Sequence, residues 1–140
     1  MSKKFVFLRK EKTIAIIEIF NEKKKNALCY NLLLELKNSF LKIEGDKDIR
    51  AIILTGRGDT FCSGMDIEWL LKEGPISMRK VNIWIQEVFS YIEQYKKPVI
   101  AALNGNTLGA GLILALICDL RLAWIPMKDG KPNGFSIQQG

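Results

Sequence analysis

Two glycine-containing turns in this 140-residue sequence lie where a strand is expected to give way to a helix. The first covers residues 61–66, FCSGMD, and the second covers residues 104–111, NGNTLGAG. At such a junction several backbone N–H groups lack acceptors, and the positive end of the helix dipole lies behind them. Each turn therefore favours an anion, or an oxygen that becomes negatively charged during a reaction.

The two turns together could direct two backbone N–H groups at one oxygen. This arrangement is an oxyanion hole, in which donors fixed in advance stabilise charge that appears only in the transition state. Loss of one such donor costs about 3 kcal/mol. The same glycine pattern also fits tight packing of a helix against a sheet, and spacing alone leaves that alternative open.

Histidine is absent from the sequence, which narrows the chemistry that side chains can perform. Ser-His-Asp triads, Cys-His pairs and most zinc sites are excluded, so proton transfer would use carboxylates, Lys, Tyr, Cys or water. The three cysteines are scattered without a CxxC motif and predict neither disulfides nor a metal site. Cys62 and Cys118 lie beside apolar residues and are expected to pack in the core.

The hydrophobic pattern predicts strands and helices in alternation. Strands are expected at residues 5–9, 13–20, 51–55, 99–102 and 120–123. The first two should form a hairpin with its turn around Lys10 and Glu11, and the third should be buried on both faces. Helices are expected at residues 28–43, from Asp66, at residues 81–95, and from the second glycine turn to Cys118. This order predicts an α/β fold with a largely parallel sheet.

Length and composition indicate one globular domain spanning residues 1–140. The 21 Lys and Arg exceed the 15 Asp and Glu, and the net charge of +6 suits a polyanionic partner such as a phosphorylated cofactor or nucleic acid. The cysteine pattern predicts a reducing cytoplasm as the location. Residues 99–118 are apolar, but Asn104, Asn106, Thr107 and the glycines argue against a membrane span.

Three segments in order resemble the enoyl-CoA hydratase/isomerase family, also called the crotonase superfamily. They are NEKKKNAL, LTGRGDTFCSGMDI and KPVIAALNGNTLGAGLILALICDLRLA. The resemblance extends from Thr13 to Ala123, and three motifs at matching spacing are far more specific than one. It implies a crotonase-like fold of repeated ββα units, here the N-terminal part of an acyl-CoA-binding core. The C-terminal helices that relatives use to form trimers or hexamers would be absent.

The resemblance also implies positions for the site. The backbone N–H groups of Met65 and Ala110 would bind the thioester oxygen of an acyl-CoA as it becomes an enolate. Residues expected to line the coenzyme A and acyl channel are Lys25, Ala27, Leu28, Ser63, Gly64, Asp66, Ile67, Gly109 and Ile113. Asp66 is also a candidate N-cap. Lys23, Lys24 and Arg57 are expected phosphate contacts on grounds of charge. The expected partner is an acyl-CoA thioester, without a metal, a membrane or a cofactor beyond the coenzyme A of the substrate.

Two departures from the family pattern concern proton transfer. Family hydratases use two glutamates, and the corresponding positions hold Ile113 and, if FSIQQ matches the second segment, Gln139. Isoleucine cannot transfer a proton, so an isomerase or another crotonase-type activity is a better expectation than a hydratase.

The residues allow two alternative readings, of which only the first stays open. One is a catalytically inactive or RNA-binding relative, suggested by the missing glutamates and the positive charge, although nucleic acid is not the expected partner. The other is a dehydrogenase-type nucleotide turn, since Gly105, Gly109 and Gly111 form GxxxGxG. We reject it because Tyr91 is followed by Tyr95 where Tyr-x-x-x-Lys requires a lysine.

Overall fold

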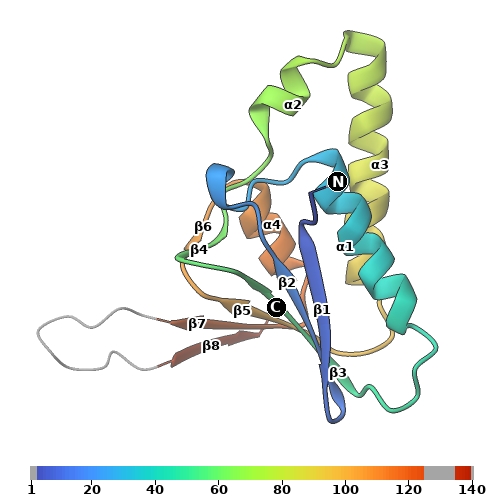
Figure 1. Cartoon of the computed structure of the whole chain (residues 1–140), viewed down its shortest axis with the longest axis vertical. Helices are drawn as coiled ribbons and strands as arrows, with labels where there is room; N and C mark the ends of the chain where they lie inside the picture. The colour runs from blue at the N-terminus through green and yellow to red at the C-terminus, as the bar shows by residue number, and fades with distance from the viewer. Residues whose placement is uncertain (1–2, 125–134, 140) are drawn as a thin grey trace, which may run out of the picture.

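The computed structural model describes residues 3–124 and 135–139 as a mixed α/β fold (Figure 1). Its strands are β1 (Val6–Glu11), β2 (Ile14–Ile19), β3 (Ala51–Gly56), β4 (Thr60–Cys62), β5 (Val99–Leu103), β6 (Asn106–Thr107), β7 (Leu120–Trp124) and β8 (Phe135–Gln139). Its α-helices are α1 (Tyr30–Ile43), α2 (Ile67–Leu71), α3 (Pro75–Glu93) and α4 (Ala110–Leu116). A short 3-10 helix covers Glu22–Lys24.

The strands form two sheets. The large sheet has the order β1-β2-β3-β5-β7-β8, and β4 pairs with β6 in a separate small sheet. Strands β2, β3, β5 and β7 are parallel, while β1 and β8 run antiparallel at the two edges. The prediction of a largely parallel sheet with an antiparallel opening hairpin is therefore confirmed.

The elements repeat as a strand of the large sheet, a second strand and a helix. The second strand belongs to the large sheet in β1-β2-α1 and to the small sheet in β3-β4-α2 and β5-β6-α4. This is the ββα repetition that the family resemblance implies. In the first and third units the strands and the following helix pack together because each buries its apolar side against the other, whereas α2 has no buried residue.

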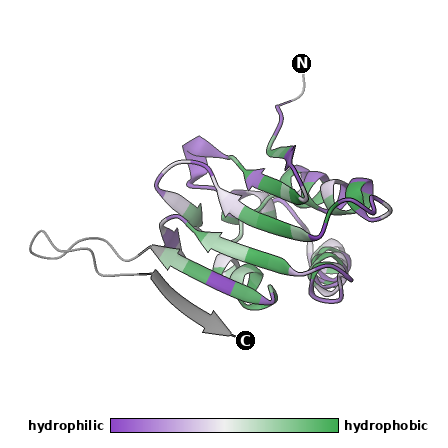
Figure 2. Ribbon diagram, turned by 90° about the horizontal axis from the view of Figure 1, so that it is seen from below, coloured by the Kyte–Doolittle hydropathy of each residue, from purple (hydrophilic) through white to green (hydrophobic). Residues whose placement is uncertain are grey.

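The core lies between the large sheet and helices α1, α3 and α4, which stand on the same side of the sheet (Figure 1). Figure 2 shows that the strands of this sheet are largely hydrophobic and the loops at their ends largely hydrophilic. Helix α1 contributes the expected helical stripe of fully buried side chains, including Leu32, Leu36 and Phe40.

Several expected boundaries were wrong. Strand β1 continues through Lys10 and Glu11, and the hairpin turn falls at Lys12 and Thr13, where Lys12 has a φ of 53°. Helix α4 ends at Leu116 rather than Cys118. Strand β3 alternates between buried and half-exposed residues, so only one of its faces is fully buried. The reason is that the described helices cover one side of the sheet, which leaves side chains such as Ile53 partly open.

The short strands β4 and β6 were not predicted, and β8 lies in a tail for which only turns were expected. Strand β4 occupies part of the segment taken as a loop. Its partner β6 lies within the second glycine turn, between the end of β5 and Gly109. The two turns are therefore tied together by strand pairing.

Within residues 3–124 and 135–139, no helix is both long enough and apolar enough to cross a membrane.

Candidate functional site

The two glycine turns lie side by side at the end of the small sheet. Strands β4 and β6 pair in parallel, with Thr60 opposite Asn106 and Cys62 opposite Thr107. The N–H of Leu108 donates to the carbonyl of Cys62 at 3.0 Å and extends this contact into the turns. The two segments then leave the small sheet in the same direction, because parallel strands end at the same edge of a sheet.

Glycine is required where the turns meet. Gly64 has a φ of 111° and Gly109 a φ of 52°, both in the left-handed region that side chains disfavour. A Cβ built on Gly64 would lie 3.3 Å from the carbonyl oxygen of Leu108 and 3.6 Å from the nitrogen of Ala110. The two backbones are thus in close contact, one residue before Met65 in the first turn and at Ala110 in the second.

The N–H groups of Met65 and Ala110, which we call the donor pair, have no acceptor among the described residues. In the first turn the N–H of Asp66 donates to Leu28, and in the second the N–H of Gly111 donates to Leu108 at 2.8 Å. Neighbouring N–H groups are therefore occupied while the donor pair is not. Two unoccupied N–H groups on contacting turns can both donate to one oxygen.

Residues 21–28 form a rigid loop beside the first turn. Asn21 and Asn26 are buried at 3% and 1% exposure, and both use their side chains to fix the loop. The amide oxygen of Asn26 accepts from the N–H of Asn21 at 2.7 Å, and its nitrogen donates to the carbonyls of Arg57 and Thr60. Asn26 has a φ of 59°, a conformation that asparagine tolerates better than most residues. Sequence reasoning missed both asparagines, although their type in a polar loop was an available signal.

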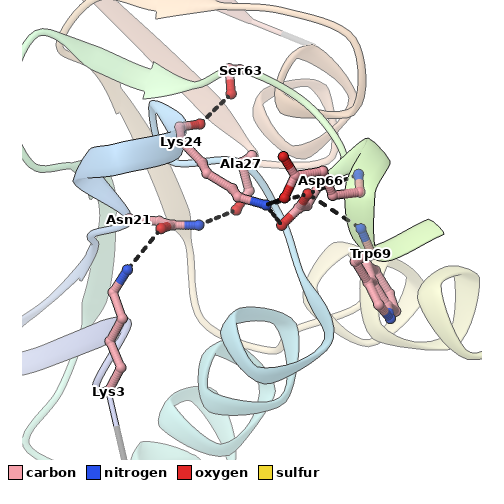
Figure 3. A network of polar contacts seen from close by, with 8 residues as sticks. Lys3, Asn21, Lys24, Ala27, Ser63, Asp66 and Trp69 are labelled. Carbon is pink, nitrogen blue, oxygen red and sulfur yellow. Dashed lines mark hydrogen bonds and ion pairs between the residues drawn. The ribbon is translucent and has the colours of Figure 1, made fainter. Parts of the chain in front are cut away.

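Asp66 connects this loop to helix α2 (Figure 3). Its carboxylate accepts from the N–H groups of Glu68 and Trp69 at 3.1 and 3.4 Å, which confirms the expected N-cap. The ammonium of Lys24 lies 2.9 Å from both carboxylate oxygens and 2.6 Å from Glu68. Asp66 is therefore bound both by Lys24 of the loop and by N–H groups of helix α2.

The pKa of Asp66 reflects these contacts. Burial alone would raise the pKa of its carboxyl, but the hydrogen bond from Lys24 and the N–H groups of Trp69 and Glu68 outweigh burial and hold the pKa below its ordinary value. The two acidic partners, Glu68 first, raise the pKa of Lys24. Both groups are therefore charged at neutral pH.

The other expected channel residues lie around the same turns, with different degrees of exposure. Ala27 and Leu28 are buried, whereas Ile67 is 67% exposed. Ser63 donates from its hydroxyl to the carbonyl of Lys24 at 3.0 Å. Lys25 pairs with Asp59 at 3.2 Å, and both residues line a hollow of about 350 Å³. Of the expected channel residues, this hollow includes only Lys25, and Arg57, an expected phosphate contact, also lines it.

The three expected phosphate contacts, Lys23, Lys24 and Arg57, differ in whether a carboxylate already pairs with them. Arg57 donates from two nitrogens to Glu18 at 2.8 and 2.6 Å, and its guanidinium lies over the rings of Phe7 and Phe20. Lys24 is occupied by Asp66 and Glu68. Within the described residues Lys23 makes no ion pair, and it is exposed. The cations nearest to the site are therefore mostly matched by carboxylates.

Ile113 lies on an apolar, exposed side of α4. Its side chain is 50% exposed, and Leu112 and Leu116 on the same helix are similarly exposed. The acids on and after α2 do not replace a missing proton donor in this geometry, because Glu68 pairs with Lys24 and Glu73 contacts the hydroxyl of Ser77. The side chain of Gln139 lies outside the described part of the structure.

Cys62 and Cys118 are buried in the core, as expected, and Asp119 joins two elements of the fold. Burial raises the pKa of the Cys62 thiol to about 11 and that of Cys118 to about 12, so both stay protonated at neutral pH. A carboxylate oxygen of Asp119 accepts from the N–H of Val99 at 2.8 Å and ties the end of the α4 segment to the start of β5. The described residues contain no cluster of side chains able to hold a metal ion.

Arg121 is a buried residue that sequence reasoning missed. Its guanidinium donates to the carbonyls of Ala115, Leu116 and Cys118 at 3.0 to 3.2 Å. These carbonyls lie at and just after the C-terminal end of α4, where helices leave carbonyls without intrahelical donors. That of Ala115 also accepts from the N–H of Cys118 at 3.3 Å. Arg121 therefore caps the helix whose first residue supplies half of the donor pair.

Comparison with known proteins gives a consistent result. The family model described as enoyl-CoA hydratase/isomerase matches residues 9–124. The chain is 38% identical over 137 residues to a crotonyl-CoA hydratase of Syntrophomonas wolfei, covering 96% of this chain and 53% of that protein. It is 39% identical over 137 residues to a short-chain-enoyl-CoA hydratase of Clostridium acetobutylicum, covering 96% and 52%.

Solved structures agree in fold. An enoyl-CoA hydratase from Bacillus anthracis superposes with a TM-score of 0.81 at 33% identity, covering 86% of this chain and 47% of that one. An enoyl-CoA hydratase subunit from Geobacillus kaustophilus gives a TM-score of 0.79 at 34% identity, covering 86% and 46%. The chain thus spans about half the length of the relatives that it matches.

Proposed function

Because this chain belongs to the enoyl-CoA hydratase/isomerase family, we propose that it binds an acyl-CoA thioester and stabilises the thioester enolate with the donor pair. The observation that carries this proposal is the contact between the two glycine turns, which leaves the N–H groups of Met65 and Ala110 adjacent and without acceptors among the described residues.

The chemistry follows from how charge moves during the reaction. When a proton leaves the carbon next to the thioester, or when a nucleophile adds to the conjugated double bond, negative charge collects on the thioester oxygen. Two N–H groups held in place by neighbouring hydrogen bonds stabilise that charge without reorganising. Backbone donors also explain why the side chains at these two positions, a methionine and an alanine, carry no proton chemistry of their own.

The reaction is proposed to be an isomerisation or another crotonase-type conversion rather than hydration. Hydration needs groups that deliver and remove the elements of water, and Ile113 stands where the resemblance places the first such glutamate. Enolate formation followed by protonation at another carbon needs fewer such groups. The cofactor requirement is limited to the coenzyme A carried by the substrate.

Crotonyl-CoA is the substrate class to test first, because the relatives include proteins named crotonyl-CoA hydratase and short-chain-enoyl-CoA hydratase. Isothermal titration calorimetry with crotonyl-CoA should give saturable binding that is tighter than that of free coenzyme A. Binding that is undetectable, or equal for the two ligands, would remove the support for a thioester site.

Self-association is proposed for the same protein. Large apolar side chains are exposed on and beside α4 and α2, among them Leu108 at 58%, Leu116 at 55% and Leu71 at 78%. Surfaces of this kind mark contacts with another polypeptide. Sedimentation velocity should detect an oligomer, and a well-behaved monomer at all concentrations would contradict it.

An RNA-binding function is the second candidate. It is favoured by a hollow of about 460 Å³ whose lining includes no residue of the glycine turns and consists of Lys10, Lys12, Thr13, Lys47, Asp48 and Arg50. Binding of this kind depends steeply on salt. Negligible RNA affinity at physiological salt, in protein that still binds crotonyl-CoA, would exclude it.

A further inference from the structure

The direction of the Met65 N–H is set by the peptide groups on either side of it. The N–H of Leu28 donates to the carbonyl of Gly64 at 2.8 Å, and the N–H of Asp66 donates to the carbonyl of Leu28 at 2.9 Å. Met65 and Leu28 thus form an isolated parallel bridge. In extended backbone successive peptide groups point to opposite sides, so the N–H of Met65 points away from Leu28.

The hydrogen bonds to the loop of residues 21–28 therefore fix the direction of this N–H. Besides the bridge at Leu28, the N–H of Ser63 donates to the carbonyl of Lys25 at 3.1 Å and the hydroxyl of Ser63 donates to the carbonyl of Lys24 at 3.0 Å. Residues 63, 64 and 66 all form hydrogen bonds with the loop, and Met65 lies between them in sequence.

The side chain of Lys24 adds a further contact, on the C-terminal side of Met65. Lys24 reaches from the loop to both carboxylate oxygens of Asp66, the residue directly after Met65 (Figure 3). The Asp66 side chain is only 10% exposed and that of Lys24 is 35% exposed, so solvent screens this pair less than it screens a surface pair. The backbone bridge and the ion pair hold the peptide before and after Met65 in one orientation.

We propose that Lys24 is a positioning residue, which holds the Met65 N–H in the direction needed for the donor pair through its ion pair with Asp66. This inference rests on the proposed function. It assigns Lys24 a role different from a phosphate contact, because its ammonium is occupied by Asp66 and Glu68. It also assigns Asp66 a positioning role, in which Asp66 acts on the Met65 N–H and does not contact the substrate.

The test measures enolate stabilisation separately from stability and affinity. Acetoacetyl-CoA, a β-keto thioester, forms an enolate that absorbs ultraviolet light, so its apparent pKa can be titrated when free and when bound. An oxyanion hole lowers the bound pKa. Lys24→Met and Asp66→Asn should each reduce that lowering by about one to two pKa units, a tenfold to hundredfold weaker preference for the enolate, as expected for misplacement of a group by up to about 1 Å.

The choice of variants separates positioning from folding. Asparagine is also a good N-cap, so Asp66→Asn removes the ion pair and keeps the cap of α2. Lys24→Arg should restore most of the effect, because it keeps the charge. The double variant should be no weaker than either single variant if both act through one ion pair. Lys10→Met is the matched control, since Lys10 forms an ion pair of similar length with Asp46 at 3.0 Å, away from the glycine turns.

Three results of these titrations would contradict the positioning role of Lys24. A bound pKa unchanged in Lys24→Met and Asp66→Asn, with only the melting temperature lowered, would show a purely structural ion pair and overturn the inference. Weaker binding of free coenzyme A by Lys24→Met, with an unchanged bound pKa, would make Lys24 a phosphate contact and also overturn it. If the unaltered protein does not lower the pKa of acetoacetyl-CoA, the proposed function itself fails and the inference falls with it.

Discussion

Replacing Ala110 by proline would remove one member of the donor pair with little other change. Ala110 is the first residue of α4, the position at which helices accept proline most readily. Its N–H has no acceptor among the described residues, so the substitution breaks no hydrogen bond of the described fold. Gly109, which precedes it, has no side chain to oppose the proline ring.

The expected effect depends on how much charge the oxygen carries. Loss of one oxyanion donor costs about 2.7–4 kcal/mol, which at about 1.36 kcal/mol per pKa unit corresponds to about 2–3 units in the pKa of bound acetoacetyl-CoA. A neutral thioester gains less from one hydrogen bond, about 0.5–1.5 kcal/mol, so its affinity should fall by only about 2- to 12-fold.

The assay is a spectrophotometric titration of acetoacetyl-CoA bound to each variant. Ala110→Gly is the matched comparison, because it removes the methyl group and keeps the N–H. The difference between the proline and glycine variants therefore measures the N–H alone, and circular dichroism melts check that both are folded. Equal bound pKa values in two folded variants would refute the assignment of Ala110.

Three further predictions concern the elements that hold the site. Gly111→Ala would drive a Cβ into the carbonyl of Cys62 and should destabilise the protein by about 1–3 kcal/mol in urea unfolding, whereas an unchanged midpoint would contradict the close packing of α4 on β4. Arg121→Met should cost about 1.5–3 kcal/mol in the same assay, because it removes charged donors from the end of α4, and a neutral result would show that the cap is dispensable. The pKa of Asp66 is lowered on folding, so its stabilising contribution is present above the ordinary aspartate pKa and is lost as pH falls through the lower folded value. The stability difference between the unaltered protein and Asp66→Asn should therefore shrink on acidification, and a difference independent of pH would contradict the ion pair.

Hydrophobic spacing was sufficient to predict most of the large sheet and its helices. Leu32, Leu36 and Phe40 recur at helical spacing and are all fully buried in α1. Strands β3 and β5 are short apolar runs, which is why they could be located from sequence. Their boundaries were less certain because ends are decided by pairing register and turn geometry, as at Lys12.

The small sheet could not be predicted by the same reasoning. Strands β4 and β6 have three and two residues, too few to show any periodicity. Their pairing joins Thr60 to Asn106, which are distant in sequence. The glycine residues were nevertheless informative, because Gly64 and Gly109 occupy left-handed positions where the two turns meet.

Charge did not predict how the cations pair within the protein. Arg57, an expected phosphate contact, pairs with Glu18 and lies over two phenylalanine rings. Composition cannot reveal such pairing, because it depends on which loops the fold brings together. The link between Lys24 and Asp66 spans two segments that are neighbours only in the folded chain, and it became visible only there.

The central claim is that the N–H groups of Met65 and Ala110 bind one thioester oxygen, and amide NMR spectroscopy tests it most directly. With 140 residues the chain gives few enough ¹⁵N–¹H resonances for their assignment. On titration with acetoacetyl-CoA, the amide protons of Met65 and Ala110 should both move downfield with the same concentration dependence. Saturable binding that leaves both resonances unmoved, with changes elsewhere in the chain, would contradict the account.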